Sequence, residues 1–148
     1  KIALSGGTHM VIASGKVMHP LEALATPSIG SWFIARSDPM TARKKWIAGT
    51  LVPKGALFVD QGAADALGSG KSLLPAGVTR LEGSFERGDA VVIKNGEGAE
   101  LGRGLVAYDD GEAKRLLGRK SSEIEAILGY SGDPELIHRD DMVLNRKS

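Results

Sequence analysis

From Gly55 onward the chain is divided into short apolar segments that end at turn-forming residues, and this spacing restricts the fold more than any other feature. The segments expected to form strands are 57–60, 72–75, 78–82, 90–94 and 101–108. The stretch Asn95-Gly96-Glu97-Gly98 separates the last two. An Asn-Gly pair favours a tight hairpin because it readily takes positive φ. Many short strands with turns between them predict a small all-β barrel or sandwich.

Three short helices are expected among these strands. One covers 61–67 and is stopped by Gly68. A second covers 112–117, with Asp110 as its N-cap and Gly118 at its end, and a third covers 123–128 and ends at Gly129. The alternation of apolar and polar residues over 137–144 predicts a closing strand. The fold class is therefore mostly β with short helices, an α+β arrangement.

The first part of the chain has a different texture. The apolar run His9–Ser14 and the segment 31–35 are expected to be strands of an α/β domain, with a helical turn over 21–24 and a helix tail at Lys1–Leu4 that stops at Gly6-Gly7. So few elements cannot bury both faces of a sheet, so we expect most of their domain to lie in a longer polypeptide. Residues 36–54 are polar, basic and flanked by proline, which predicts a linker anchored by Trp46 and Ile47. The expected divisions are 1–35, 36–54 and 55–148.

Composition excludes several kinds of site. Lys and Arg number 19 against 18 Asp and Glu, and this net charge of +1 gives no global field that would hold nucleic acid. The chain has no cysteine, which excludes disulfides and zinc–sulfur sites and fits a reducing, cytoplasmic setting. Its apolar runs are too short to span a bilayer, so no membrane association is expected.

The run from His138 to Asn145, HRDDMVLN, matches the catalytic-loop pattern of protein kinases. That loop works only together with a following DFG aspartate and a preceding glycine-rich loop. Three residues follow Asn145, and no G-x-G-x-x-G precedes it. We therefore interpret this run as a terminal strand with surface charges.

Other motifs also have plainer explanations. The run Gly68–Ser72, GSGKS, resembles a phosphate loop, but Asp65 occupies the place of its first glycine. The three histidines are far apart in sequence, and the paired acids Asp109-Asp110 and Asp140-Asp141 are typical of helix caps and solvated strand ends. We predict no catalytic residue and no metal site in this chain.

Local basic residues leave RNA binding open as an alternative. In GKSLLPAGV, Gly70 and Gly77 would let a backbone approach closely while Lys71 supplies charge. Acidic residues are interleaved with the basic ones, and this mixture weighs against a phosphate track. The candidate RNA-binding residues are Lys71, Ser72, Gly77, Arg80, Arg119 and Lys120.

Several longer stretches resemble a known family. They are RKKWIAG, GKSLLPAGV, FERGDAVVI, GRGLVAYDDGEAKRL, GRKSSEIEAILGY and LIHRDDMVLN. Together they resemble the C-terminal region of the bacterial glutamate 5-kinase family, and the central ones also resemble the wider PUA domain, a small pseudo-barrel found in pseudouridine synthases and archaeosine transglycosylases. The opening KIALSGGTHMVIASG is similar to the tail of an amino-acid kinase domain.

The resemblance implies a function for a longer parent protein. The family transfers the γ-phosphoryl group of ATP to the side-chain carboxylate of L-glutamate, with magnesium, in proline biosynthesis. Its nucleotide- and glutamate-binding segments match no position here, so this chain is expected to be inactive alone and to serve regulation or assembly. We also expect a homo-oligomer, because strands with open edges can pair with those of a second copy.

Overall fold

The computed structural model describes residues 7–16, 18–25, 30–35, 39–49 and 52–145. They fall into two compact units, Lys1–Arg43 and Lys44–Ser148. Each unit is described by itself. No helix among the described residues has both the length and the apolar character needed to cross a bilayer.

The first unit contains one antiparallel pair of strands, β1 (Met10–Ala13) and β2 (Gly30–Phe33), with the short helix α2 (Pro20–Ala23) between them in sequence. Met10 is paired with Phe33, and Val11 with Trp32. Several apolar side chains of this pair are exposed, including Ile12 at 57% and Trp32 at 52%. The two strands were predicted, whereas the predicted helix tail at 1–4 lies outside the described residues.

Helix α3 (Pro39–Gly49) runs across the boundary between the units. A linker was predicted over 36–54, and the helical conformation of 39–49 was not expected. Proline is favoured at the first position of a helix, which explains why the helix begins at Pro39. The predicted anchor is confirmed at Ile47, which is completely buried, while Trp46 remains 46% exposed.

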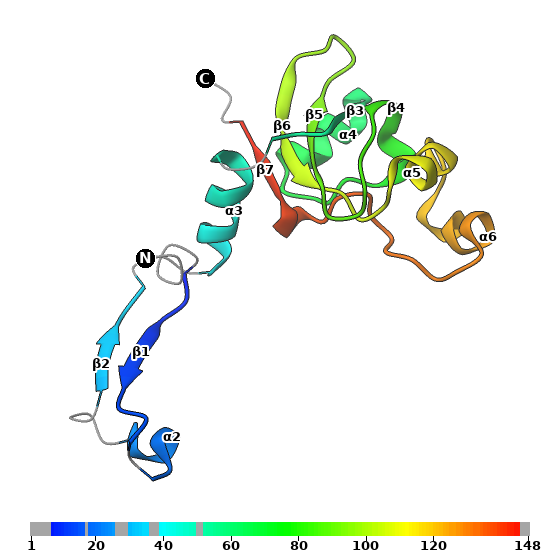
Figure 1. Ribbon diagram of the computed structural model, residues 1–148. Coiled ribbons are helices and arrows are strands. Elements are labelled where there is room, and N and C mark those ends of the chain that lie inside the picture. Colours follow the sequence, from blue (N-terminus) through cyan, green and yellow to red (C-terminus); the bar gives the residue numbers. More distant parts are fainter. Residues whose placement is uncertain (1–6, 17, 26–29, 36–38, 50–51, 146–148) are drawn as a thin grey trace. The chain divides into compact units, whose positions relative to one another are not determined.

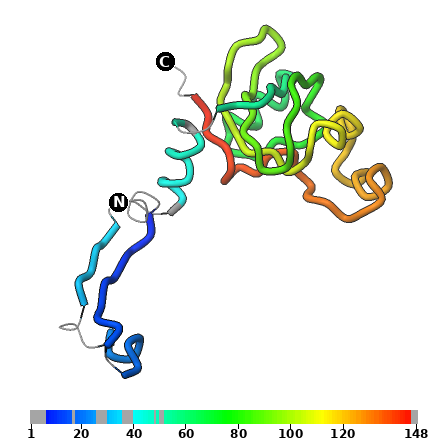
Figure 2. Tube along the Cα trace, in the orientation of Figure 1, coloured from blue at the N-terminus to red at the C-terminus, as the bar shows by residue number. Residues whose placement is uncertain are grey.

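The second unit is built on a five-stranded sheet in the order β4-β3-β5-β6-β7, shown in Figures 1 and 2. Strands β3 and β5 are parallel, and every other neighbouring pair is antiparallel. The strands are β3 (Gly55–Val59), β4 (Val78–Gly83), β5 (Ala90–Lys94), β6 (Glu100–Leu105) and β7 (Met142–Leu144). The helical elements are α4 (Gln61–Gly68), η1 (Pro75–Gly77), α5 (Asp110–Leu116), η2 (Ser121–Glu123), α6 (Ile124–Leu128) and η3 (Arg139–Asp141).

Strand β3 is apolar throughout because both of its faces are covered. Leu57 and Val59 belong to the hydrophobic core, at 0% and 1% exposure. On the other face, the Arg80 guanidinium lies 3.7 Å from the centre of the Phe58 ring, and the Lys94 ammonium lies 5.6 Å from it. Such cation–π contacts cover the ring while the charges stay in water.

Three predicted strands of this unit are shorter than expected. The strand predicted over 101–108 is β6, which ends at Leu105. Segment 72–75 contributes only a single bridge, from Leu73 to Ile137, because Pro75 begins η1. The closing strand predicted over 137–144 is interrupted by η3, and only Met142–Leu144 pair with β6. The hairpin at Asn95 is present, but the residue with positive φ is Gly98 (φ 86°) rather than the Asn-Gly pair.

Candidate ligand groove

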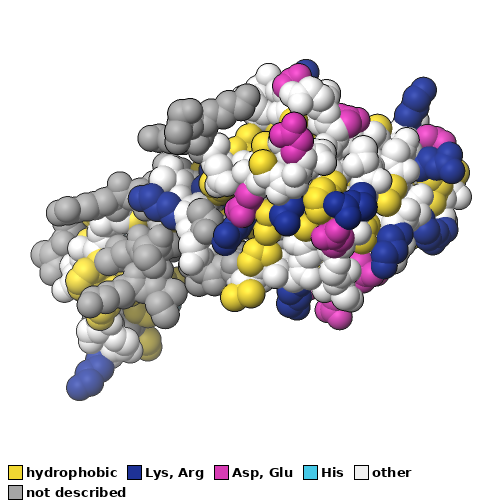
Figure 3. All heavy atoms as spheres, turned by 90° about the horizontal axis from the view of Figure 1, so that it is seen from above, with side chains coloured by type: hydrophobic (Ala, Val, Ile, Leu, Met, Phe, Trp, Pro, Cys, Tyr) yellow, Lys and Arg dark blue, Asp and Glu magenta, His cyan; other side chains and the backbone are white. Residues whose placement is uncertain are grey.

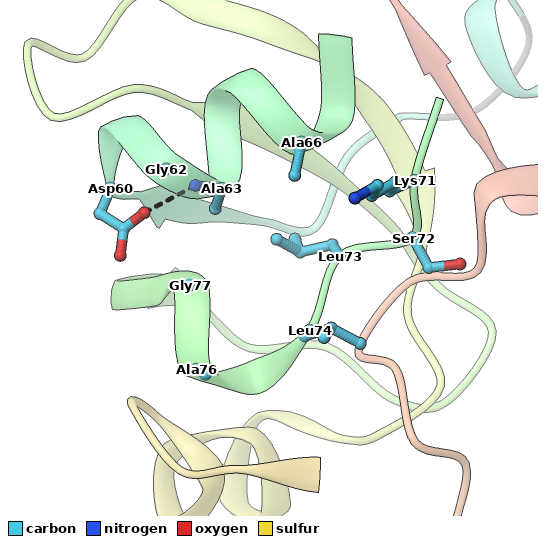
Figure 4. Close-up of a pocket in the computed structure, with 10 residues that line it drawn as sticks. All are labelled: Asp60, Gly62, Ala63, Ala66, Lys71, Ser72, Leu73, Leu74, Ala76 and Gly77. Atoms are coloured by element: carbon cyan, nitrogen blue, oxygen red, sulfur yellow. Dashed lines mark hydrogen bonds between the residues drawn. The ribbon is translucent and has the colours of Figure 1, made fainter. Parts of the chain in front are cut away.

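A groove with a volume of about 440 Å³ lies between helix α4 and the 3-10 turn η1, as shown in Figure 4. Strand β3 ends just before α4 and strand β4 begins directly after η1, and these two strands are neighbours in the sheet. Most of its surface is contributed by apolar atoms. Its lining residues are Asp60, Gly62, Ala63, Ala66, Lys71, Ser72, Leu73, Leu74, Ala76 and Gly77.

Asp60 fixes one end of the groove. Its side chain accepts a hydrogen bond from Ala63 N at 2.7 Å and so caps the N-terminus of α4. Its backbone N–H donates to the Gly77 carbonyl at 3.0 Å, which ties α4 to η1. A Cβ atom added at Gly77 would overlap the Cβ of Ala63. Gly77 is therefore required for the close packing of the two walls.

Lys71 and Ser72 lie at the other end, after α4 has finished. Gly70 takes a positive φ of 78°, a conformation that ends helices, and nothing lies within 4 Å of a Cβ added there. The Ser72 hydroxyl accepts a hydrogen bond from Arg139 N at 3.0 Å, so it already joins this end to η3. The positive φ of this turn explains why residue 70 is glycine. Close approach of another backbone, the reason considered from the sequence, is not needed to explain the glycine.

The GSGKS run lies at the C-terminal end of α4. A phosphate loop instead precedes a helix and presents its N-terminal N–H groups to the phosphate. Here the carbonyl groups of Asp65, Ala66 and Leu67 face the run and accept from Ser69, Lys71 and Gly70. The interpretation of GSGKS as a glycine-rich turn is confirmed.

The HRDDMVLN run also has a structural role. The His138 ring nitrogen Nδ1 accepts from Asp140 N at 3.2 Å at the start of η3. Asn145 binds the first residues of β6. Its backbone N–H donates to Leu101 O at 2.8 Å, and its side chain donates to Glu100 O at 3.2 Å. The predicted strand in this run is confirmed for Met142–Leu144, which form β7. The N-cap of α5 is Asp109, which accepts from Glu112 N at 2.8 Å, so the prediction of Asp110 as the cap was wrong by one residue.

The six candidate RNA-binding residues separate into three places. Lys71, Ser72 and Gly77 line the groove. Arg119 and Lys120 directly follow Gly118, whose N–H donates to Pro75 O at 3.0 Å in η1, so their segment contacts this wall of the groove. Arg80 lies on β4, stacked on Phe58 and paired with Glu82, and does not line the groove.

The groove is suited to binding rather than to catalysis. Small side chains on α4 and η1 leave a narrow apolar slot, and its charged lining residues, Asp60 and Lys71, lie at opposite ends (Figure 4). A ligand with a flat apolar body and an anionic group near Lys71 fits this arrangement. Within the described ranges, no three His, Cys, Asp or Glu residues are grouped so that they could hold a metal ion.

Ionisable groups with shifted pKa values lie away from the groove. Burial raises the pKa of Tyr108 to about 12, and its hydroxyl donates to the Asp133 carbonyl. The backbone N–H of Glu86 and the Lys54 ammonium lower the pKa of Asp89. On the face seen in Figure 3, acidic and basic side chains are interspersed.

Sequence reasoning missed most of the groove. Ala63, Ala66, Leu73 and Leu74 line it, yet small apolar residues look like core residues in a sequence. One signal that was not used is Asp60, an acidic residue directly before a predicted helix and hence a cap that fixes where α4 begins.

The second unit can be assigned to a family. The PUA domain family matches residues 55–128, and the chain belongs to that family. The predicted fold class, a mostly β pseudo-barrel with short helices, is confirmed.

The curated relatives are more specific. The chain is 58% identical over 144 residues to a glutamate 5-kinase of Bradyrhizobium sp. strain BTAi1, covering 97% of this chain and 38% of the relative. It is 57% identical over 144 residues to a glutamate 5-kinase of Rhodopseudomonas palustris strain BisB5, with the same coverage. The predicted resemblance is confirmed, and the chain spans about 38% of the length of these relatives.

Solved structures resemble the chain more distantly. A PUA domain from Aeropyrum pernix K1 matches with a TM-score of 0.44 and 18% identity, covering 88% of this chain and 85% of that one. The archaeal box H/ACA sRNP Nop10–Cbf5 complex matches with a TM-score of 0.35 and 16% identity, covering 72% of this chain and 29% of that one.

Proposed function

We propose that this chain is the PUA-containing part of a glutamate 5-kinase, a cytoplasmic enzyme of proline biosynthesis that transfers the γ-phosphoryl group of ATP to the side-chain carboxylate of L-glutamate. The observation that carries this proposal is 58% identity to a glutamate 5-kinase over 97% of the chain. The segments responsible for phosphoryl transfer would then lie in the part of the relatives that this chain does not span.

The described residues do not fit ATP and magnesium, which the enzyme requires. The GSGKS run lies at the wrong end of a helix for phosphate, and the described part of the chain lacks a cluster of acidic ligands. We therefore assign no catalytic step to these residues. Their role in the parent is regulation or assembly, through a rigid domain attached beside the catalytic part.

The test compares the complete gene product with the 148-residue chain. Glutamyl phosphate is trapped with hydroxylamine, and ADP release is measured with and without L-glutamate. The complete product should form hydroxamate only when ATP, magnesium and L-glutamate are all present, and the 148-residue chain should form none. A complete product without glutamate-dependent turnover, or an active 148-residue chain, would contradict the proposal.

The regulatory part has its own test, deletion of residues 44–148 from the complete product. We expect turnover to persist while the response to proline or the number of subunits in the homo-oligomer changes. Steady-state kinetics with proline and light scattering provide the two measurements. An unchanged proline response together with an unchanged subunit number would refute a regulatory or assembly role.

A second candidate function is RNA binding by the groove. The observation that favours it is the gathering of Lys71, Ser72 and Gly77 in one apolar slot, with the segment that carries Arg119 and Lys120 hydrogen-bonded to its η1 wall. A slot of this kind suits one unpaired base with its phosphate at Lys71. An RNA duplex is wider than the groove, so the partner would be single-stranded.

Titration with tRNA at low and physiological salt tests this candidate. Lys71→Ala should weaken binding and reduce the salt slope by about 1. Lys94→Ala is the matched control, because it removes the same charge from a side chain stacked on Phe58. A dissociation constant weaker than tens of micromolar at low salt, or equal effects of the two substitutions, would remove RNA from consideration.

A further inference from the structure

The tip of the β5–β6 hairpin holds an asparagine side chain against its own main chain. Asn95 N donates to Ala99 O at 3.0 Å, and Gly98 N donates to Asn95 O at 3.0 Å. The side-chain oxygen Oδ1 accepts two further bonds, from Glu97 N at 3.1 Å and from Ala99 N at 2.8 Å. Figure 2 shows this turn projecting away from the rest of the sheet. The Asn95 carboxamide is thereby folded back over the peptide that follows it.

The next residue, Gly96, leaves that peptide open to reaction. Gly96 is exposed, and a Cβ built on it would meet nothing within 4 Å. In the described part of the chain its N–H makes no hydrogen bond, whereas the neighbouring N–H groups of Glu97, Gly98 and Ala99 all do. The backbone nitrogen that follows Asn95 in the chain is therefore unhindered and makes no hydrogen bond with the described residues.

We propose that Asn95 is a site of spontaneous deamidation. The Gly96 backbone nitrogen, after losing its proton to water, attacks Cγ of Asn95 and forms a new N–Cγ bond. The Cγ–Nδ2 bond breaks, Nδ2 leaves as ammonia after taking up a proton, and a five-membered succinimide remains. Water then adds to one of its two carbonyl carbons and yields aspartate or isoaspartate at position 95.

The hydrogen bonds to Oδ1 assist the first step. When the nitrogen attacks, negative charge develops on Oδ1, which becomes the oxyanion of a tetrahedral intermediate. The N–H groups of Glu97 and Ala99 already point at this atom, so they stabilise the developing charge without reorganisation. The turn thus stabilises the intermediate and also leaves the Gly96 nitrogen exposed.

The two products have different consequences for the hairpin. Aspartate keeps the acceptor for both N–H groups and adds a negative charge close in sequence to Glu97 and Glu100. Isoaspartate routes the main chain through the former side chain and lengthens it by one atom, which separates Asn95 N from Ala99 O. Both products therefore add a negative charge to the tip, and isoaspartate also breaks its closing hydrogen bonds.

Two other positions in the chain provide internal comparisons. Asp110 also precedes a glycine, but Gly111 lies within α5, and the Asp110 carboxylate is held by Lys114 at 2.8 Å. Asn145 precedes an arginine, whose side chain hinders attack by its nitrogen, and its Nδ2 donates to Glu100 O at 3.2 Å. Conversion is expected at Asn95 well before either of these positions.

The test uses the purified 148-residue chain, aged at mildly alkaline pH and physiological temperature. Peptide mapping by mass spectrometry measures the amide-to-acid change at Asn95 and Asn145, and enzymatic methylation detects isoaspartate at positions 95, 110 and 145. Both products should accumulate at position 95, while acid at position 145 and isoaspartate at positions 110 and 145 should lag far behind. Gly96→Ala should slow conversion about tenfold by shielding the nitrogen. This variant keeps the fold, because Gly96 has an ordinary φ and free space around it.

Asn95→Asp serves as the reference for the aspartate product and should never yield ammonia from this position. Conversion at Asn95 no faster than at Asn145 would overturn the proposal. Equal rates in the original chain and in Gly96→Ala would overturn it too, because the nitrogen of Gly96 would then not be the nucleophile.

Discussion

Apolar strands occur in both units of this chain, but they are covered in the second unit and partly exposed in the first. In the second unit, β3 is covered on both faces, by the core on one side and by Arg80 and Lys94 on the other. In the first unit, β1 and β2 pair only with each other among the described residues, and Ile12 and Trp32 are about half exposed. An isolated two-stranded hairpin is marginally stable in water. The comparison indicates that the second unit is self-sufficient, whereas the first needs cover that the described residues do not supply.

The largest expected effect separates the two units directly. Leu57→Ala removes a completely buried side chain from β3 and should lower the free energy of unfolding by about 2–5 kcal/mol. Ile12→Ala on the exposed face of β1 should change it by about 0.5 kcal/mol or less. Urea denaturation monitored by circular dichroism measures both. Similar losses for the two variants would mean that the units share one cooperative core.

A smaller effect is expected where α4 meets η1. Gly77→Ala places a Cβ on that of Ala63 and should cost about 1–3 kcal/mol through overpacking. Ala63→Gly in the same chain should restore part of the loss, since it removes the atom that is struck. Gly68→Ala is the control, because nothing lies within 4 Å of its added Cβ. A stable Gly77→Ala variant would show that the groove walls can separate without cost.

The cap of α4 should contribute less again. Asp60→Ala removes the acceptor for Ala63 N and should cost about 1 kcal/mol of the free energy of unfolding. Asp60→Asn keeps an acceptor at the same place and should recover most of that loss. If Asp60→Asn proved as unstable as Asp60→Ala, the capping hydrogen bond would not be the cause.

An effect of similar size at neutral pH is expected at Tyr108. Tyr108→Phe loses the hydrogen bond to Asp133 O and should cost about 1 kcal/mol. The pKa of Tyr108 is raised from 10.0 to about 12, so the unfolded chain loses this proton first as pH rises. Stability should therefore be retained below pH 10 and fall between pH 10 and about 12, and Tyr108→Phe should show a shallower fall. Denaturation at several alkaline pH values measures the slope, and identical slopes would exclude Tyr108 as the cause.

The sequence predicted the second unit well where local signals agree. Segment 90–94 is a strand with the predicted bounds, and helix α4 extends the predicted range by one residue, to Gly68. The predictions failed where a long-range partner decides the structure. Leu73 pairs with Ile137 in a single bridge, and the two residues lie far apart in the chain, so neither segment by itself indicates its partner.

Two further misses have physical causes. Residues 39–49 were predicted as a linker because they are polar, and their helical conformation was not predicted. Proline is favoured at the first position of a helix, so Pro39 could have indicated where this helix begins. In the groove, Lys71 and Ser72 stood out by charge and position, whereas the slot itself depends on the approach of Gly77 to Ala63. That approach joins residues on two different elements, and only the folded chain brings them together.

Hydrogen exchange of the intact 148-residue chain tests most directly whether the second unit is self-sufficient and the first is not. Amides in β3 and β5 should exchange only through global unfolding, while those of β1 and β2 should exchange far faster, with little protection. Equal protection of Val11 and Leu57 in this chain would contradict the account.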